Sequence, residues 1–187
     1  MIIKEDKTIF IHIPKNAGTS IKTCFENSSF VVQPEKHDTA HEIKNKFPEL
    51  YSSYRKFAVV RNPYDRMVSW YFYLKRQALK HIKNYNRSTN NYNIIEFKKW
   101  IDEPLQFWYD PIHYLEPQYD WLDDSVVVLK YENLQNDINN FFNREIKLPL
   151  INESEHEHYL NYYDKRSLDI VYNNYKVDFD KYNYKKI

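Results

Sequence analysis

The 187-residue chain contains one glycine, Gly18, which lies between an apolar run and a pair of hydroxyl side chains. Ordinary proteins contain about 7% glycine and use it in many turns. Glycine permits a positive φ and lets a ligand approach the main chain. The position of the one glycine therefore indicates a turn that requires one of these two properties. The apolar run over residues 8–13 predicts a buried strand. Thr19 and Ser20 predict the cap and first turn of a helix over 18–27.

This strand, turn and helix together predict an anion site. Lys15 lies in the same turn as Gly18, and the free N–H groups and positive end of a helix attract phosphate or sulfate. Gly18 could instead only shape the turn, but the lysine and the two hydroxyls converge there and favour an anion site. The segment is not a Walker A loop, because in that motif the lysine follows the last glycine. A nucleoside triphosphate with magnesium is therefore not the first expectation.

A second segment repeats the pattern of strand, turn and helix. Apolar residues predict a strand over 56–60, and a helix-compatible pattern follows over 65–82. Arg61 comes at the C-terminal end of the strand, where open α/β sheets bind ligands, and its planar guanidinium suits a phosphate. Ser69 would lie about two turns into the helix. The alternative for Arg61 is a surface ion pair, for instance with Asp65.

Together the two segments resemble those of carbohydrate sulfotransferases, the family of the heparan sulfate and chondroitin enzymes. Residues 14–20 resemble the family's Pro-Lys-x-x-Gly-Thr-Ser/Thr loop, which holds the 5′-phosphosulfate of 3′-phosphoadenosine 5′-phosphosulfate (PAPS). Residues 61–69 resemble the segment that binds the 3′-phosphate. The resemblance extends more weakly over nearly the whole chain, through 116–122, 129–134 and 162–182. It implies that the cofactor-binding residues are Lys15, Asn16, Ala17, Gly18, Thr19, Ser20, Arg61 and Ser69.

The resemblance implies a small enzyme of the soluble bacterial or viral type that transfers a sulfuryl group from PAPS to a hydroxyl of a carbohydrate acceptor. Lys15 is then expected to have a second, catalytic role. It would stabilise the negative charge that develops on the bridging oxygen as its bond to sulfur breaks. Two other functions stay open from the residues alone: a nucleotide kinase or phosphotransferase, and a catalytically inactive nucleotide-binding module.

The acceptor hydroxyl must lose a proton, and histidine is the usual base because its unperturbed pKa of ~6.5 lies near working pH. His37 begins a His-x-Thr-Ala-x-Glu-Ile pattern that resembles a family segment near the acceptor site, so we expect His37 to be the base. It could instead cap or flank the helix predicted over 39–46. His41 is expected in solvent, and the next candidates for the base are Glu35 and His113.

No metal is expected, because the spacing fixes no third ligand beside His37 and His41, whereas zinc sites use three or four. The formal net charge of +1 gives no electrostatic case for a nucleic-acid partner. No run approaches the ~20 apolar residues of a membrane span, and the N-terminal residues lack a signal-peptide pattern, so we expect a cytoplasmic protein. The lone Cys24 forms no internal disulfide and is expected to be a buried helix thiol.

Length and alternation of elements predict one domain, 1–187, with an α/β fold. Its expected form is a mostly parallel central sheet flanked by helices, with a P-loop-like PAPS-binding loop. The remaining expected strands cover 31–32 and 125–130, and the remaining expected helices cover 94–102, 133–144 and 164–176.

Two stretches could contact the acceptor. Aromatic residues over 108–115 could line a sugar cleft or pack in the core. The end of the second segment's helix is basic and could attract an acidic polysaccharide or be a solvated helix end; its residues are Lys75, Arg76, Lys80, His81, Lys83 and Arg87. The acceptor's identity and the oligomeric state do not follow from the sequence.

Overall fold

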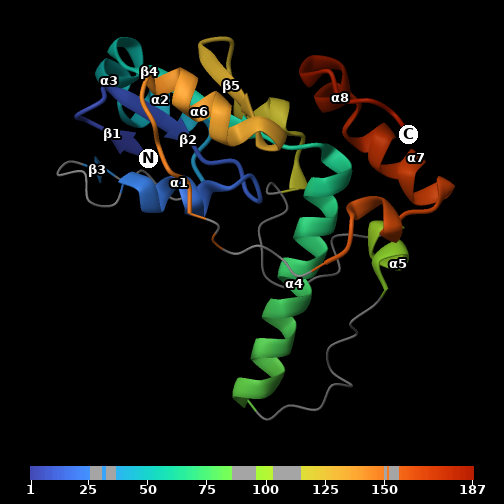
Figure 1. The fold of residues 1–187 in the computed structure, drawn as a ribbon. Helices are drawn as coiled ribbons and strands as arrows, with labels where there is room; N and C mark the ends of the chain where they lie inside the picture. The colour runs from blue at the N-terminus through green and yellow to red at the C-terminus, as the bar shows by residue number, and fades with distance from the viewer. Residues whose placement is uncertain (26–30, 33–36, 86–95, 103–114, 150, 152–155) are drawn as a thin grey trace. The chain divides into compact units, whose positions relative to one another are not determined.

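The chain was studied as a computed structural model that describes residues 1–25, 31–32, 37–85, 96–102, 115–149, 151 and 156–187. It divides into two compact units, drawn in one colour ramp in Figure 1. Unit 1 comprises Met1–Asn62 and Glu116–Glu153, and unit 2 comprises Pro63–Leu115 and Ser154–Ile187. The single domain 1–187 stays a prediction.

Unit 1 contains a five-stranded sheet of order β3-β1-β2-β4-β5. The three longer strands, β2, β4 and β5, are parallel, and β1 pairs antiparallel with β2 and β3. The predicted α/β fold with a mostly parallel sheet is thereby confirmed. The strands are β1 (Ile2–Ile3), β2 (Thr8–Ile11), β3 (Val31–Val32), β4 (Arg55–Val60) and β5 (Val126–Lys130).

Helices contact both faces of this sheet. Successive side chains of a strand point to opposite faces, so one strand can pack against helices on both sides. Phe10, Phe57 and Val59 pack in one cluster with residues of α1 and α6. Lys56 points the other way, and its Nζ donates to the carbonyl of Tyr51 in α3 at 2.9 Å. The helices of unit 1 are α1 (Gly18–Phe25), α2 (Ala40–Lys46), α3 (Pro48–Ser53) and α6 (Leu134–Phe142), with the 3₁₀ turns η4 (Gln118–Trp121) and η5 (Tyr131–Asn133).

Unit 2 is helical and has an aromatic core. Tyr64, Trp70 and Phe179 are buried there, and the hydroxyl of Tyr163 donates to the carbonyl of Tyr64 at 2.7 Å. The elements are α4 (Pro63–Tyr85), α5 (Phe97–Asp102), the 3₁₀ turn η6 (Tyr159–Tyr162), α7 (Lys165–Asn174) and α8 (Lys176–Tyr182). Many of the chain's aromatic residues therefore pack in a core.

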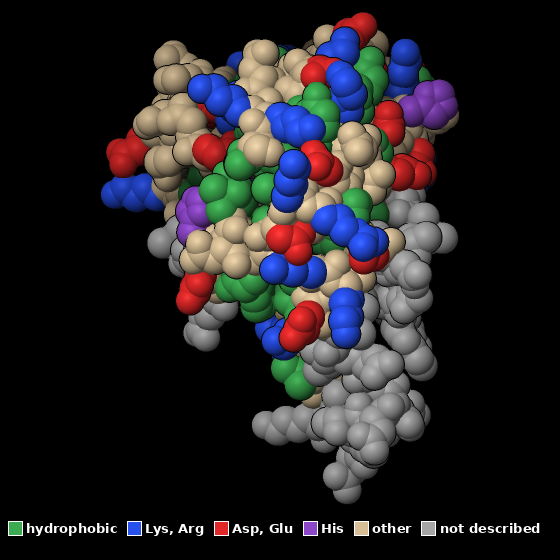
Figure 2. Space-filling view, turned by 90° about the vertical axis from the view of Figure 1, so that its right-hand side faces the viewer, with side chains coloured by type: hydrophobic (Ala, Val, Ile, Leu, Met, Phe, Trp, Pro, Cys, Tyr) green, Lys and Arg blue, Asp and Glu red, His purple; other side chains and the backbone are tan. Residues whose placement is uncertain are grey.

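Two observations concern the surface. On the face that Figure 2 shows, acidic and basic side chains are interspersed among those coloured by type. In the described part of the chain, no helix is both long and apolar enough to cross a bilayer. The cytoplasmic location stays a prediction.

Cys24 lies on α1 as expected but is only partly buried, and its Sγ lies 3.3 Å from the carbonyl of Lys147.

Candidate functional site

The loop between β2 and α1 has the backbone of an anion-binding nest. Lys15 has a φ of 71° and Ala17 a φ of 59°, while Asn16 between them has a negative φ. Left-handed residues that alternate with ordinary ones turn successive N–H groups toward one concave side, as in phosphate-binding loops. Such angles cost non-glycine residues about 1–3 kcal/mol each and gather at ligand sites. The N-terminus of α1 follows at once, with its own unsatisfied N–H groups.

Gly18 itself does not have a positive φ, so the first of the two reasons expected for this glycine is wrong, and the close approach of a ligand stays a prediction. A Cβ built on Gly18 would lie 1.8 Å from Nε2 of His12. The imidazole of His12 lies against the Cα of Gly18, so any larger residue at position 18 would require this ring to move. The expected cap is also wrong, since α1 begins at Gly18 and places exposed Thr19 and buried Ser20 inside its first turn.

A buried amide network joins this loop to the end of β4. Nδ2 of Asn16 donates to the carbonyl of Val59 and to Oε1 of Gln118, each at 2.7 Å. Oε1 of Gln118 also accepts from the N–H of Arg61, and its Nε2 donates to the carbonyl of Arg61, each at 2.9 Å. Gln118 is 0% exposed and Asn16 is 1% exposed. Gln118 thus connects the loop at Asn16 to the residue that follows β4, Arg61, and holds the two predicted phosphate-binding segments of unit 1 together.

Arg61 is buried, at 8% exposed, so it does not lie on the surface as the alternative of a surface ion pair required. One guanidinium nitrogen donates to the carbonyl of Lys15 at 3.2 Å, and the guanidinium carbon lies 4.1 Å from the centre of the Tyr131 ring. The hydrogen bond and this cation–π contact together restrain the guanidinium. Ser69 is buried in α4 and belongs to unit 2, so its placement beside Arg61 stays a prediction.

His37 lies beside the same loop. Its Nδ1 is 3.1 Å from the carbonyl oxygen of His12, and the two imidazole centres are 4.5 Å apart with planes tilted by 47°. The structure therefore brings the predicted base and the predicted cofactor loop together within unit 1. His41, by contrast, is exposed as expected, and its Nε2 lies 3.0 Å from Nδ2 of Asn45.

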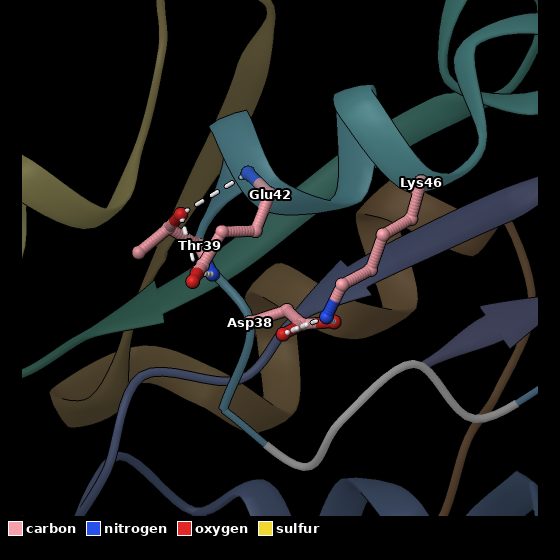
Figure 3. Close-up of polar contacts among 4 residues, drawn as sticks. All are labelled: Asp38, Thr39, Glu42 and Lys46. Carbon is pink, nitrogen blue, oxygen red and sulfur yellow. Dashed lines mark hydrogen bonds and ion pairs between the residues drawn. The ribbon is translucent and has the colours of Figure 1, made fainter.

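The cap of α2 is formed by Thr39, not by His37. The Thr39 hydroxyl accepts from the Glu42 N–H at 3.2 Å, and the Glu42 carboxylate accepts from the Thr39 N–H at 2.7 Å (Figure 3). This reciprocal pair is a capping box. Asp38 is 5% exposed, and its carboxylate accepts from Nζ of Lys46 at 2.8 and 2.9 Å. The two residues that follow His37 are thus both anchored to α2, and the idea that His37 caps this helix is wrong.

Some predicted residues cannot be placed. Glu35, His113 and the aromatic stretch 108–114 lie outside the described residues, as does Arg87 of the basic stretch. Within the described ranges, no three His, Cys, Asp or Glu side chains come together in a group that could hold a metal ion.

Two residues that matter in this geometry, His12 and Gln118, had no role in the sequence-based prediction. Their contacts join positions up to 102 residues apart, which no local pattern reveals. The only signals were their places beside quoted motifs: His12 precedes the Pro-Lys loop, and Gln118 lies in the weaker matching segment 116–122.

Comparison with known proteins adds one finding. The model of the family described as "Sulfotransferase family" matches residues 1–185 of the chain. No curated protein and no solved structure gave a match.

Proposed function

Because the chain belongs to the sulfotransferase family, we propose that it transfers the sulfuryl group of PAPS to a hydroxyl of a carbohydrate or glycoconjugate acceptor. Membership supports sulfuryl transfer in general, and the donor and acceptor are the parts we propose. The observation that supports the donor best is the nest at Lys15 and Ala17, which directly precedes the N-terminus of α1. Such a loop is suited to the phosphate of a phosphosulfate.

The two ends of PAPS would be held by different groups. The N–H groups of residues 16–20 bind the 5′-phosphate. Arg61 and Ser69 recognise the 3′-phosphate, a pairing that rests on the resemblance in sequence. The contacts of Arg61 with Lys15 and Tyr131 support this assignment, because they orient the guanidinium before a ligand arrives. An oriented guanidinium loses less conformational freedom on binding an anion.

The chemical step divides between Lys15 and His37. His37 takes the proton of the acceptor hydroxyl while that oxygen forms its bond to sulfur. The bond between sulfur and the bridging oxygen breaks, and the ammonium group of Lys15 stabilises the charge left on that oxygen. Both residues lie on unit 1, where His37 contacts the carbonyl of His12, two residues before the cofactor loop begins.

Transfer of radioactive sulfate tests the proposal. The chain is incubated with sulfur-labelled PAPS and a panel of charged and uncharged polysaccharides, and label released to water is measured in parallel. We expect labelled polysaccharide, and His37→Ala should lower turnover by ~10²–10⁴, the usual contribution of a general base. His41→Ala is the matched control because His41 is exposed on α2 and should keep nearly full activity. Label in neither polysaccharide nor free sulfate would contradict the proposal.

A further inference from the structure

The imidazole of His12 lies between the cofactor loop and the predicted base. On one side it approaches Gly18 so closely that a Cβ there would lie within 1.8–2.5 Å of three of its ring atoms. On another side its centre is 4.5 Å from that of His37, and it stacks on Phe10 at 5.6 Å with an interplanar angle of 22°. Phe10 is 2% exposed in the core of unit 1. The ring of His12 is therefore supported from the core and packed against both the loop and the base.

The backbone of His12 determines which nitrogen of His37 can act. A carbonyl oxygen only accepts hydrogen bonds, so the 3.1 Å contact requires a proton on Nδ1 of His37. In a neutral imidazole, a proton on Nδ1 leaves the lone pair on Nε2. The contact thus selects Nε2 as the atom that accepts a proton. Asp38 and Thr39, which follow His37, are held by α2, so the ring is restrained from both sides.

We propose that His12 is a positioning residue for sulfuryl transfer: its carbonyl keeps the proton of His37 on Nδ1, and its ring keeps Nε2 of His37 oriented beside the Gly18 loop. This inference rests on the proposed function of His37 as the base. It also explains the chain's one glycine, because any side chain at position 18 would displace the ring on which the base packs.

Nitrogen NMR tests the tautomer without acceptor or donor. The chain is labelled with ¹⁵N-histidine, and the signals of His37 are assigned by their loss in His37→Gln. At a pH where the ring is neutral, we expect a protonated Nδ1 and an unprotonated Nε2. The opposite tautomer in the wild type would overturn the inference, and this result needs no variant that could fail to fold.

Two substitutions of His12 separate positioning from direct chemistry. His12→Phe keeps a flat ring that can stack on Phe10, whereas His12→Ala removes the ring. We expect His12→Ala to lower sulfuryl transfer about 10–100-fold, as misplacement of a reacting group does, and His12→Phe to recover most of that loss. Affinity for 3′-phosphoadenosine 5′-phosphate should change little in either variant. Equal loss in both variants, or no loss in His12→Ala, would overturn the inference.

Gly18→Ala provides an independent test of the packing. Its methyl group should displace the His12 ring and lower sulfuryl transfer, and adding His12→Ala should cause little further loss because both changes act through the same contact. Additive effects would overturn the inference. Failure of the wild type to bind 3′-phosphoadenosine 5′-phosphate would instead refute the proposed function, and the tautomer of His37 would still be measurable.

Discussion

Replacing Gln118 by methionine tests the buried network that joins the cofactor loop to β4. Methionine has a similar length but cannot replace the three hydrogen bonds that Gln118 makes at 2.7–2.9 Å. Three buried groups lose Gln118 as partner: one N–H of the Asn16 amide, whose other N–H keeps the carbonyl of Val59, and the N–H and C=O of Arg61. A buried polar group that loses its partner costs about 1–3 kcal/mol, so the free energy of unfolding should fall by at least about 3 kcal/mol.

Thermal unfolding followed by circular dichroism measures this effect. For a chain of this size, 1 kcal/mol corresponds to about 2–4 °C, so the melting temperature of Gln118→Met should fall by at least about 6 °C. Gln77→Met is the control, since Gln77 is partly exposed on α4 and its replacement should stay within about 0.5 kcal/mol. Calorimetry should also show weaker binding of 3′-phosphoadenosine 5′-phosphate. If Gln118→Met melted with the wild type and bound the nucleotide equally well, the network would not position the two segments.

Three further predictions concern the nucleotide and the pH dependence of stability. Arg61→Ala should weaken binding of 3′-phosphoadenosine 5′-phosphate at least tenfold and remove the preference over AMP in calorimetry, because a charged hydrogen bond contributes about 1.5–3 kcal/mol. Lys15→Ala should lower turnover more than affinity for that product in steady-state kinetics, because its charge acts in the transition state. Burial alone would raise the pKa of Asp123, but hydrogen bonds from Ser125 and Tyr51 hold it below its ordinary value. The hydrogen bonds to the Asp123 carboxylate therefore stabilise the fold above the unfolded-state pKa, and this stabilisation is lost as pH falls through the folded-state pKa. Tyr51→Phe should accordingly lower the melting temperature at pH 7 but not in strong acid.

The elements that the sequence predicted well have strong local signals. The helix predicted over 39–46 agrees with the start of α2 within one residue, and Thr39 and Glu42 form a capping box there. The apolar runs before Lys15 and Arg61 gave β2 and β4, because both are buried parallel strands. Elements that were missed have weak signals. Strand β1 has two residues and no alternation to detect, and helix α3 follows Phe47 directly at Pro48. The sequence predicted a single helix over 164–176. In the structure, α7 ends at Asn174 and a separate helix, α8, begins at Lys176.

For the candidate site, sequence motifs predicted residues but not the contacts that hold them in place. Lys15 and Arg61 could be proposed as site residues because each follows a predicted strand in a specific pattern. The roles of His12 and Gln118 depend on contacts with residues such as His37, which are far away in the sequence. Gly18 shows the same limit. The sequence shows that it is the chain's one glycine, but the contact of its Cα with the His12 ring is visible only in the structure, and its φ is not positive.

The most direct test of the account is isothermal calorimetry of the wild-type chain with three nucleotides: 3′-phosphoadenosine 5′-phosphate, AMP, and ATP with magnesium. The account predicts that 3′-phosphoadenosine 5′-phosphate binds at least tenfold more tightly than AMP, since Arg61 recognises the 3′-phosphate. It also predicts that ATP with magnesium binds more weakly than 3′-phosphoadenosine 5′-phosphate. Equal affinity for 3′-phosphoadenosine 5′-phosphate and AMP, or tighter binding of ATP with magnesium, would contradict it.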